Sequence, residues 1–144
     1  MQQNKAEQAL ACFDEGFNCA QAILSTYGAE LGLTRETALH LALGLGAGMG
    51  RLQETCGAVT GAYLVVGLSY SKIFPDPEQA KEKTYAVVQE FDRLFRAKNQ
   101  TTNCRELIGV DLRQGDRQIA QKQVKTVCPR LIQDAAEILE QLLS

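Results

Sequence analysis

The chain has 144 residues, a formal net charge of −2 and a hydrophobic content of 45%. This length suits a protein that buries its own core, so we expect residues 1–144 to form a single domain. The slightly acidic balance argues against nucleic acid or an anionic membrane as a partner, because either needs a dense basic face. The longest apolar run is far shorter than the roughly 20 residues of a membrane span, and the first residues lack an export signal, so we expect a cytoplasmic protein.

Helical periodicity covers almost the whole chain and strand-like alternation is nearly absent. The sequence therefore predicts an all-α fold, a single compact helical bundle of about seven or eight helices. In chain order the expected helices span about residues 3–12, 19 to 28 or 32, 35–43, 56–69, 77–98, 104–108, 114–124 and 129–143.

Local signals mark several of these helix starts. Asn18 and Asn103 each precede a cysteine and are followed three residues later by Gln21 or Glu106, which is the pattern of a capping box. Asp76 followed by proline is the strongest start signal in the chain. Asn18, Asp76 and Asn103 should therefore start the helices expected at residues 19, 77 and 104 through local contacts alone.

Four of the five cysteines lie at expected helix starts, namely Cys19, Cys56, Cys104 and Cys128. Thr55 would cap the helix at Cys56, and Cys128 would itself cap a helix that begins at Pro129. A helix N-terminus carries unpaired N–H groups and partial positive charge, which favour the thiolate form needed for metal ligation and thiol redox chemistry. The alternative is that these cysteines are small core residues. Cys12 is outside this pattern, because it lies where the first helix should end.

The cysteine spacing argues against the simplest metal sites. No Cys-x-x-Cys pair is present, which argues against a zinc ribbon or a standard ferredoxin motif. Ligands from four helices can still converge inside a bundle. Arg51, Arg105, Lys125 and Arg130 lie near cysteines in the sequence and could lower thiol pKa values or offset cluster charge, although such residues are more often simply solvated.

Glycines cluster beside these cysteines. The run from residue 44 to residue 50 follows an expected helix and lacks the lysine of a phosphate loop, so nucleotide binding is disfavoured. The glycines instead allow the backbone to approach a neighbouring helix or a bound group closely. Gly57 and Gly61 are four apart and predict either tight helix packing or room for a cluster. The candidate cofactor-binding positions are Gly48, Gly50, Gly57 and Gly61.

Segments 16–21, 46–51, 54–62, 103–107 and 127–129, taken in this order, resemble the C_GCAxxG_C_C family of bacterial and archaeal proteins. The Gly-Cys-Ala order in the family's name stands here as Cys56-Gly57-Ala58. The resemblance covers nearly the whole chain and implies a redox-active protein with an iron–sulfur or similar prosthetic group. Its four characteristic cysteines carry over to Cys19, Cys56, Cys104 and Cys128 as the implied metal ligands.

Three functions remain open at this point. The first is an iron–sulfur protein for electron transfer or redox sensing, and the second is a metal-free thiol–disulfide protein. In the second, Cys56 would be the catalytic thiol, with its pKa lowered by the helix N-terminus. The third is a non-catalytic protein, either with a four-cysteine zinc site or as a helical adaptor without any cofactor. A redox partner protein is expected for the first two, and self-association into a homo-oligomer is left open.

Overall fold

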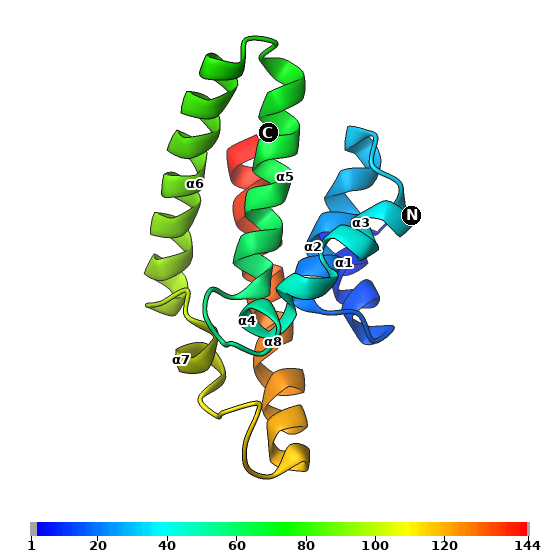
Figure 1. Cartoon of the computed structure of the whole chain (residues 1–144), viewed down its shortest axis with the longest axis vertical. Helices are drawn as coiled ribbons and strands as arrows, with labels where there is room; N and C mark the ends of the chain where they lie inside the picture. Colours follow the sequence, from blue (N-terminus) through cyan, green and yellow to red (C-terminus); the bar gives the residue numbers. More distant parts are fainter. Residues whose placement is uncertain (1–2, 144) are drawn as a thin grey trace.

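The computed structural model describes residues 3–143, and within them it confirms the predicted all-α fold (Figure 1). The helices are α1 (Lys5–Asp14), α2 (Cys19–Gly28), α3 (Arg35–Leu41), α4 (Gly46–Met49), α5 (Gly57–Ile73), α6 (Pro77–Asn99), α7 (Cys104–Ile108) and α8 (Arg117–Leu143). Two short 3₁₀ segments, Ala29–Leu31 and Leu43–Leu45, connect α2 to α3 and α3 to α4. Among the described residues no helix is long and apolar enough to cross a membrane.

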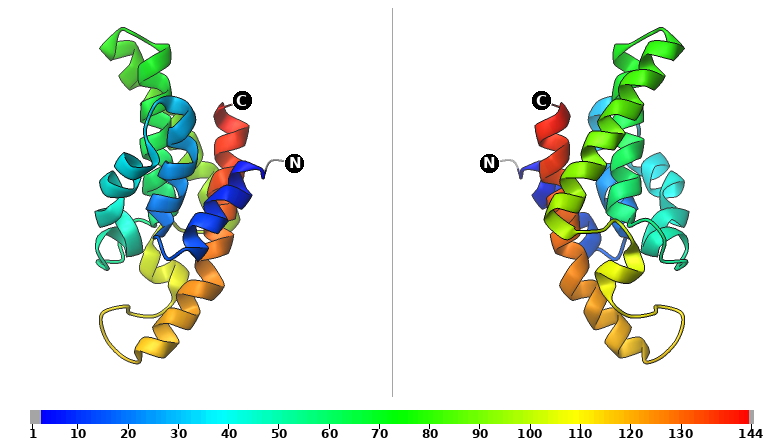
Figure 2. Two further views of the ribbon diagram at one scale, coloured as in Figure 1. Left: turned by 90° about the vertical axis from the view of Figure 1, so that its right-hand side faces the viewer. Right: turned by 90° about the vertical axis from the view of Figure 1, so that its left-hand side faces the viewer.

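Helix α8 packs against five other helices and organises the bundle. It contacts α1, α2, α5, α6 and α7, while α2 and α5 form the most extensive helix pair. Figure 2 shows the first turns of α8 extending below the rest of the bundle, next to the loop that follows α7. The largest fully buried side chains come from α2, α5, α6 and α8, and include Ile23, Val65, Phe91, Phe95 and Ile132. The hydrophobic core therefore runs between these four helices.

The predicted caps form, with one difference. Asn18 accepts a hydrogen bond from the Gln21 N–H at 2.9 Å, and the Gln21 side chain accepts one from the Asn18 N–H at 2.9 Å, which completes the capping box of α2. Asn103 caps α7 in the same way by accepting from the Glu106 N–H at 2.9 Å. The Glu106 carboxylate, however, accepts from the Thr101 hydroxyl at 2.7 Å, so the second half of the predicted box is absent.

The predicted break before Pro129 is wrong. Helix α8 is continuous from Arg117 to Leu143, with Pro129 inside it, so Cys128 lies within a helix and caps nothing. Proline lacks the N–H that would bond to the carbonyl of Lys125, which weakens a helix locally. Burial of the following α8 residues, Leu131 among them at 1% exposure, offsets that loss. Tertiary packing thus overrides the local preference of proline.

Two other predicted boundaries move by a few residues. Cys56 itself is the N-cap of α5, because Thr55 is paired with Asn103 in an isolated antiparallel bridge. Helix α3 ends at Leu41, so Leu43 lies outside it in the 3₁₀ segment and is 63% exposed.

Candidate cysteine site

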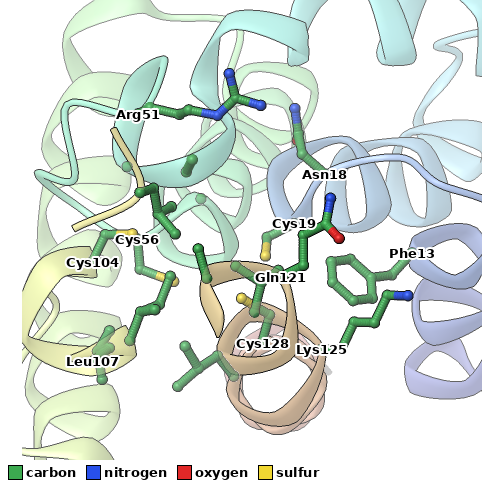
Figure 3. Close-up of a pocket in the computed structure, with 18 of the residues that line it drawn as sticks. Phe13, Asn18, Cys19, Arg51, Cys56, Cys104, Leu107, Gln121, Lys125 and Cys128 are labelled. Carbon is green, nitrogen blue, oxygen red and sulfur yellow. The ribbon is translucent and has the colours of Figure 1, made fainter. Parts of the chain in front are cut away.

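All four cysteines singled out in the sequence line one cavity, whose volume is about 1230 Å³ (Figure 3). The cavity lies between the end of α1, the starts of α2, α5 and α7, and the first half of α8. The fifth cysteine, Cys12, does not line it, and its sulfur lies 3.5 Å from the Ser25 hydroxyl in the core. The fold therefore brings together four cysteines that are far apart in the sequence.

Three helix N-termini and one helix interior present these thiols. Cys19 is the first residue of α2, Cys104 is the first residue of α7, and Cys56 caps α5. Cys128 reaches the cavity from the middle of α8. All four cysteines are buried, with exposures between 4% and 7%. Positive ends of three helix dipoles thus meet at the cavity, where the thiols themselves are shielded from solvent.

The predicted glycine positions divide into two groups. Gly48 and Gly57 line the cavity. A Cβ on Gly57 would lie 3.2 Å from the Ala20 nitrogen and 3.3 Å from the Cys19 Cβ, so this glycine lets α5 approach the start of α2. Gly61 does not line the cavity, because it packs against the Ala20 main chain, where a Cβ would lie 3.0 Å from the carbonyl oxygen. Gly50 is exposed and also lies outside the cavity lining.

The glycine-rich segment forms a left-handed turn at the edge of the cavity. Residues 47–51 all have positive φ, from 57° at Ala47 to 70° at Met49. Left-handed conformation costs a residue with a side chain roughly 1–2 kcal/mol, so left-handed residues normally occur singly and not in a run of five. Two hydrogen bonds hold it, from Gln53 N–H to the Ala47 carbonyl at 3.2 Å and from Glu54 N–H to the Gly48 carbonyl at 3.0 Å. Such strained backbone is typical of functional sites.

Gln53 is a site residue that the sequence did not indicate. It is 5% exposed and has a φ of 56°. Its side chain donates to the Val110 carbonyl at 2.9 Å and accepts from the Leu112 N–H at 2.8 Å. The same amide group also hydrogen-bonds to Cys104, which lowers the pKa of that thiol. No sequence signal marks this glutamine, because its partners lie more than 50 residues away.

Cys19 and Cys128 form a hydrogen-bonded thiol pair. The Cys19 thiol donates to Cys128, which lowers the pKa of Cys128 and raises the pKa of Cys19 well above its ordinary value. Burial acts on both thiols in the direction of the neutral form. Of the two thiols, Cys128 is therefore the one whose pKa is lowered by the pair and Cys19 the one whose pKa is raised.

The predicted low pKa of Cys56 is wrong. Burial raises the pKa of Cys56 to about 12, although the N–H groups of Ala58 and Val59 at the start of α5 act in the opposite direction. Burial also raises the pKa of Cys104 to about 11. Desolvation of a thiolate thus outweighs the favourable helix terminus at both positions.

The four cavity thiols lie close to one another but do not converge on one point. Each of the four cysteines is close enough to the other three to interact with them. Cys19 and Cys128 share a hydrogen bond, and in the other pairs the charge of one thiolate raises the pKa of the other thiol. Within residues 3–143, however, no three histidine, cysteine, aspartate or glutamate side chains converge closely enough to hold one metal ion. The thiols therefore surround a shared volume without meeting at one point.

Residues 17–142 match the family described as "Putative redox-active protein (C_GCAxxG_C_C)". The chain belongs to this family. The matched region contains all four cavity cysteines and begins after Cys12, in agreement with the place of Cys12 outside the cavity. No curated protein and no solved structure matches the chain. This C_GCAxxG_C_C protein is thus a member of a redox-active family with several cysteines, and the cavity is where those cysteines gather.

Proposed function

We propose that the cavity binds an iron–sulfur cluster through Cys19, Cys56, Cys104 and Cys128, and that the protein serves electron transfer or redox sensing. The observation that carries the proposal is the arrangement of four buried thiols from four helices around one cavity. Thiolates are the ligands that iron–sulfur clusters use most often. The redox description of the family supports the same chemistry.

We favour a cluster over a single zinc ion as the occupant of the cavity. Four ligands of one zinc ion must all lie within about 2.3 Å of the same point. The described residues hold no such three-ligand group, whereas a cluster of several irons takes its thiolates at separate corners. We therefore regard a zinc site, and a purely structural helical protein, as less favoured functions than cluster binding.

The chain's own residues would hold and tune such a site. The starts of α2, α5 and α7 direct N–H groups and positive potential at it, and the Gln53 amide donates to Cys104. The left-handed turn closes one edge of the cavity, and burial of the thiols keeps water away. When bound, a cluster would accept and release single electrons, with a potential set by these hydrogen bonds and by burial.

Anaerobic reconstitution with iron and sulfide tests the proposal. We expect the parent to bind both elements and to gain visible charge-transfer absorbance. Cys56→Ser should lose most of the iron and absorbance, because a serine oxygen is a poorer ligand. Cys12→Ser is the matched control, since it removes a buried cysteine outside the cavity and should behave like the parent. Equal iron, sulfide and absorbance in both variants would refute cluster binding at this site.

The Cys19–Cys128 pair supports a second candidate, metal-free thiol–disulfide exchange. The Cys128 thiolate would attack a disulfide of a partner molecule and release one thiol, and Cys19 would then displace the second thiol to leave a Cys19–Cys128 disulfide. Two electrons pass to the partner disulfide, which leaves as two thiols. In this candidate Cys128 replaces Cys56 as the attacking residue, because the pKa of Cys128 is lowered and that of Cys56 is raised.

Both candidates need a protein or small molecule that exchanges electrons with the site. They also need thiols that stay reduced, which a compartment such as the cytoplasm provides. All five cysteines are free in the structure. A redox partner protein and a cytoplasmic location therefore remain part of the proposal, and a homo-oligomer remains an open prediction.

A further inference from the structure

The cavity is larger and more varied than four thiols require. Its volume of about 1230 Å³ exceeds the roughly 300–1000 Å³ of ordinary small-molecule pockets. Beyond the cysteines, its lining has an apolar part and a cationic part. The apolar part includes Phe13, Phe17, Leu107, Leu112 and Val124.

Four cationic side chains line the cavity against a single acidic one. The cations are Arg51, Arg113, Arg117 and Lys125, and the acid is Asp14. The whole chain has more acidic than basic residues, so composition alone does not explain this excess. Positive charge is concentrated where the cavity opens, since all four cations are exposed while the thiols are buried.

These four cations form no ion pair within the described part of the chain. Other basic residues do find partners, and Arg105, which also lies near a cysteine in the sequence, pairs with Asp111 at 3.4 Å. Cations without acidic partners at a cavity mouth attract an anion from solution.

Helix α8 extends from the exposed cations at the opening of the cavity to the buried thiols. Arg117, Gln121 and Lys125 follow one another at intervals of four and form a polar row along its cavity face. The adjacent row ends at the buried Cys128. In Figure 3 Lys125 and Gln121 project from α8 beside Phe13, and Arg51 lies across the cavity near Asn18. One helix face thus presents charge outside and sulfur inside.

We infer that the cavity is a binding site for a small organic anion, whose acidic group contacts Arg117 and Lys125 and whose apolar body lies against Phe13 and Val124. This inference rests on the proposed redox function, because it assigns a substrate class to the same site. Paired contacts to cations give an anion direction and affinity, while the apolar wall excludes small hydrated ions.

Two related dyes test this inference by calorimetric titration. The probes are 8-anilinonaphthalene-1-sulfonate and N-phenyl-1-naphthylamine, which share an apolar body but differ in charge. The proteins are the parent, Arg117→Gln/Lys125→Gln, and the matched control Lys122→Gln/Arg130→Gln. The control removes two exposed cations from the same helix that do not line the cavity. Each protein is titrated both reduced without metal and after iron–sulfide reconstitution.

We expect the parent to bind the sulfonate about tenfold more tightly than the neutral dye, and the Arg117/Lys125 variant to lose about that factor. The control should keep the parent's affinity, and added salt should weaken sulfonate binding only. Equal binding of both dyes, no binding, or an equal loss in the control would overturn the inference. Loss of sulfonate binding on reconstitution would also overturn it, because the cations would then only balance cluster charge.

The two proposals can fail separately in this experiment. If no iron or sulfide binds but the sulfonate still depends on Arg117 and Lys125, cluster binding is wrong and the anion site stands. If the cluster assembles and the two cations have no effect on the sulfonate, cluster binding stands and the anion site is wrong.

Discussion

Cys56 and Cys104 position each other through their main chains. The Cys56 N–H donates to the Thr102 carbonyl at 2.8 Å, and the Cys104 N–H donates to the Glu54 carbonyl at 2.6 Å. Each cysteine thus bonds to the residue two positions before the other, around the Thr55–Asn103 bridge. Because each cysteine also begins or caps a helix, this exchange fixes the starts of α5 and α7 at one side of the cavity.

Gly48→Ala should destabilise the protein by about 2–4 kcal/mol, because it combines left-handed strain with overpacking. A Cβ there would lie 2.6 Å from the Gln53 Cα and 2.7 Å from the Cys104 Cβ. Gly115→Ala is the control, since that glycine also has positive φ but has no atom near its Cβ position, and it should cost only about 1 kcal/mol. Urea unfolding measures both. Similar losses in the two variants would show that the contact with Cys104 is unimportant.

Gly61→Ala should cost about 1–3 kcal/mol, because the new methyl group would press on the Ala20 main chain at 3.0 Å. Gly67→Ala changes the same helix in the same way, but its nearest neighbour, Thr84, is 4.0 Å away. That variant should gain up to about 1 kcal/mol from better helix propensity. Thermal unfolding of the two variants should therefore shift in opposite directions, and a shared direction would contradict tight α2–α5 packing.

Gln53→Ala should destabilise the protein by about 1–3 kcal/mol, because the Val110 carbonyl and the Leu112 N–H would lose their side-chain partner. It should also raise the pKa of Cys104, since the amide that lowers it is removed. The control is Gln114, which is exposed and lies between α7 and α8, in the loop that also contains Val110 and Leu112. Gln114→Ala should have little effect on either quantity. Unfolding free energy and the pH dependence of Cys104 alkylation are the measurements. An unchanged Cys104 profile would remove Gln53 from the site.

In the reduced, metal-free protein, Cys128 should be alkylated at lower pH than the other cavity cysteines. Its pKa is lowered, so its thiolate forms first, whereas Cys104 and Cys56 ionise only near their pKa values of about 11 and 12. Cys19→Ala should move the Cys128 profile to higher pH, because the Cys19 thiol is the hydrogen-bond donor that stabilises the thiolate.

Mass spectrometry of samples treated with iodoacetamide across a pH series gives, for each thiol, the pH at which alkylation reaches half its maximal rate. This pH is the midpoint of that thiol's profile. Cys12→Ala serves as the control, and we expect it to leave the Cys128 midpoint unchanged because Cys12 does not line the cavity. If Cys56 reacts at the lowest pH, burial does not dominate at the start of α5.

Local interactions explain what could be predicted from the sequence. The caps at Asn18, Asp76 and Asn103 depend on contacts three residues apart, and these helices begin where expected. The cysteines shared with the family were likewise identifiable from residue types and order, and they do line one cavity. Their local sequence placed Cys19 and Cys104 correctly at helix starts.

Long-range contacts decided the remainder. Packing of α8 against five helices keeps it continuous through Pro129, so Cys128 enters the cavity from a helix interior. Burial, which no local pattern specifies, reverses the expected order of thiol acidity between Cys56 and Cys128. The role of Gln53 depends on partners more than 50 residues away. Local sequence thus determined most helix starts and identified the candidate cysteines. Desolvation and contacts between distant segments decided which of these thiols are paired and which have a lowered pKa.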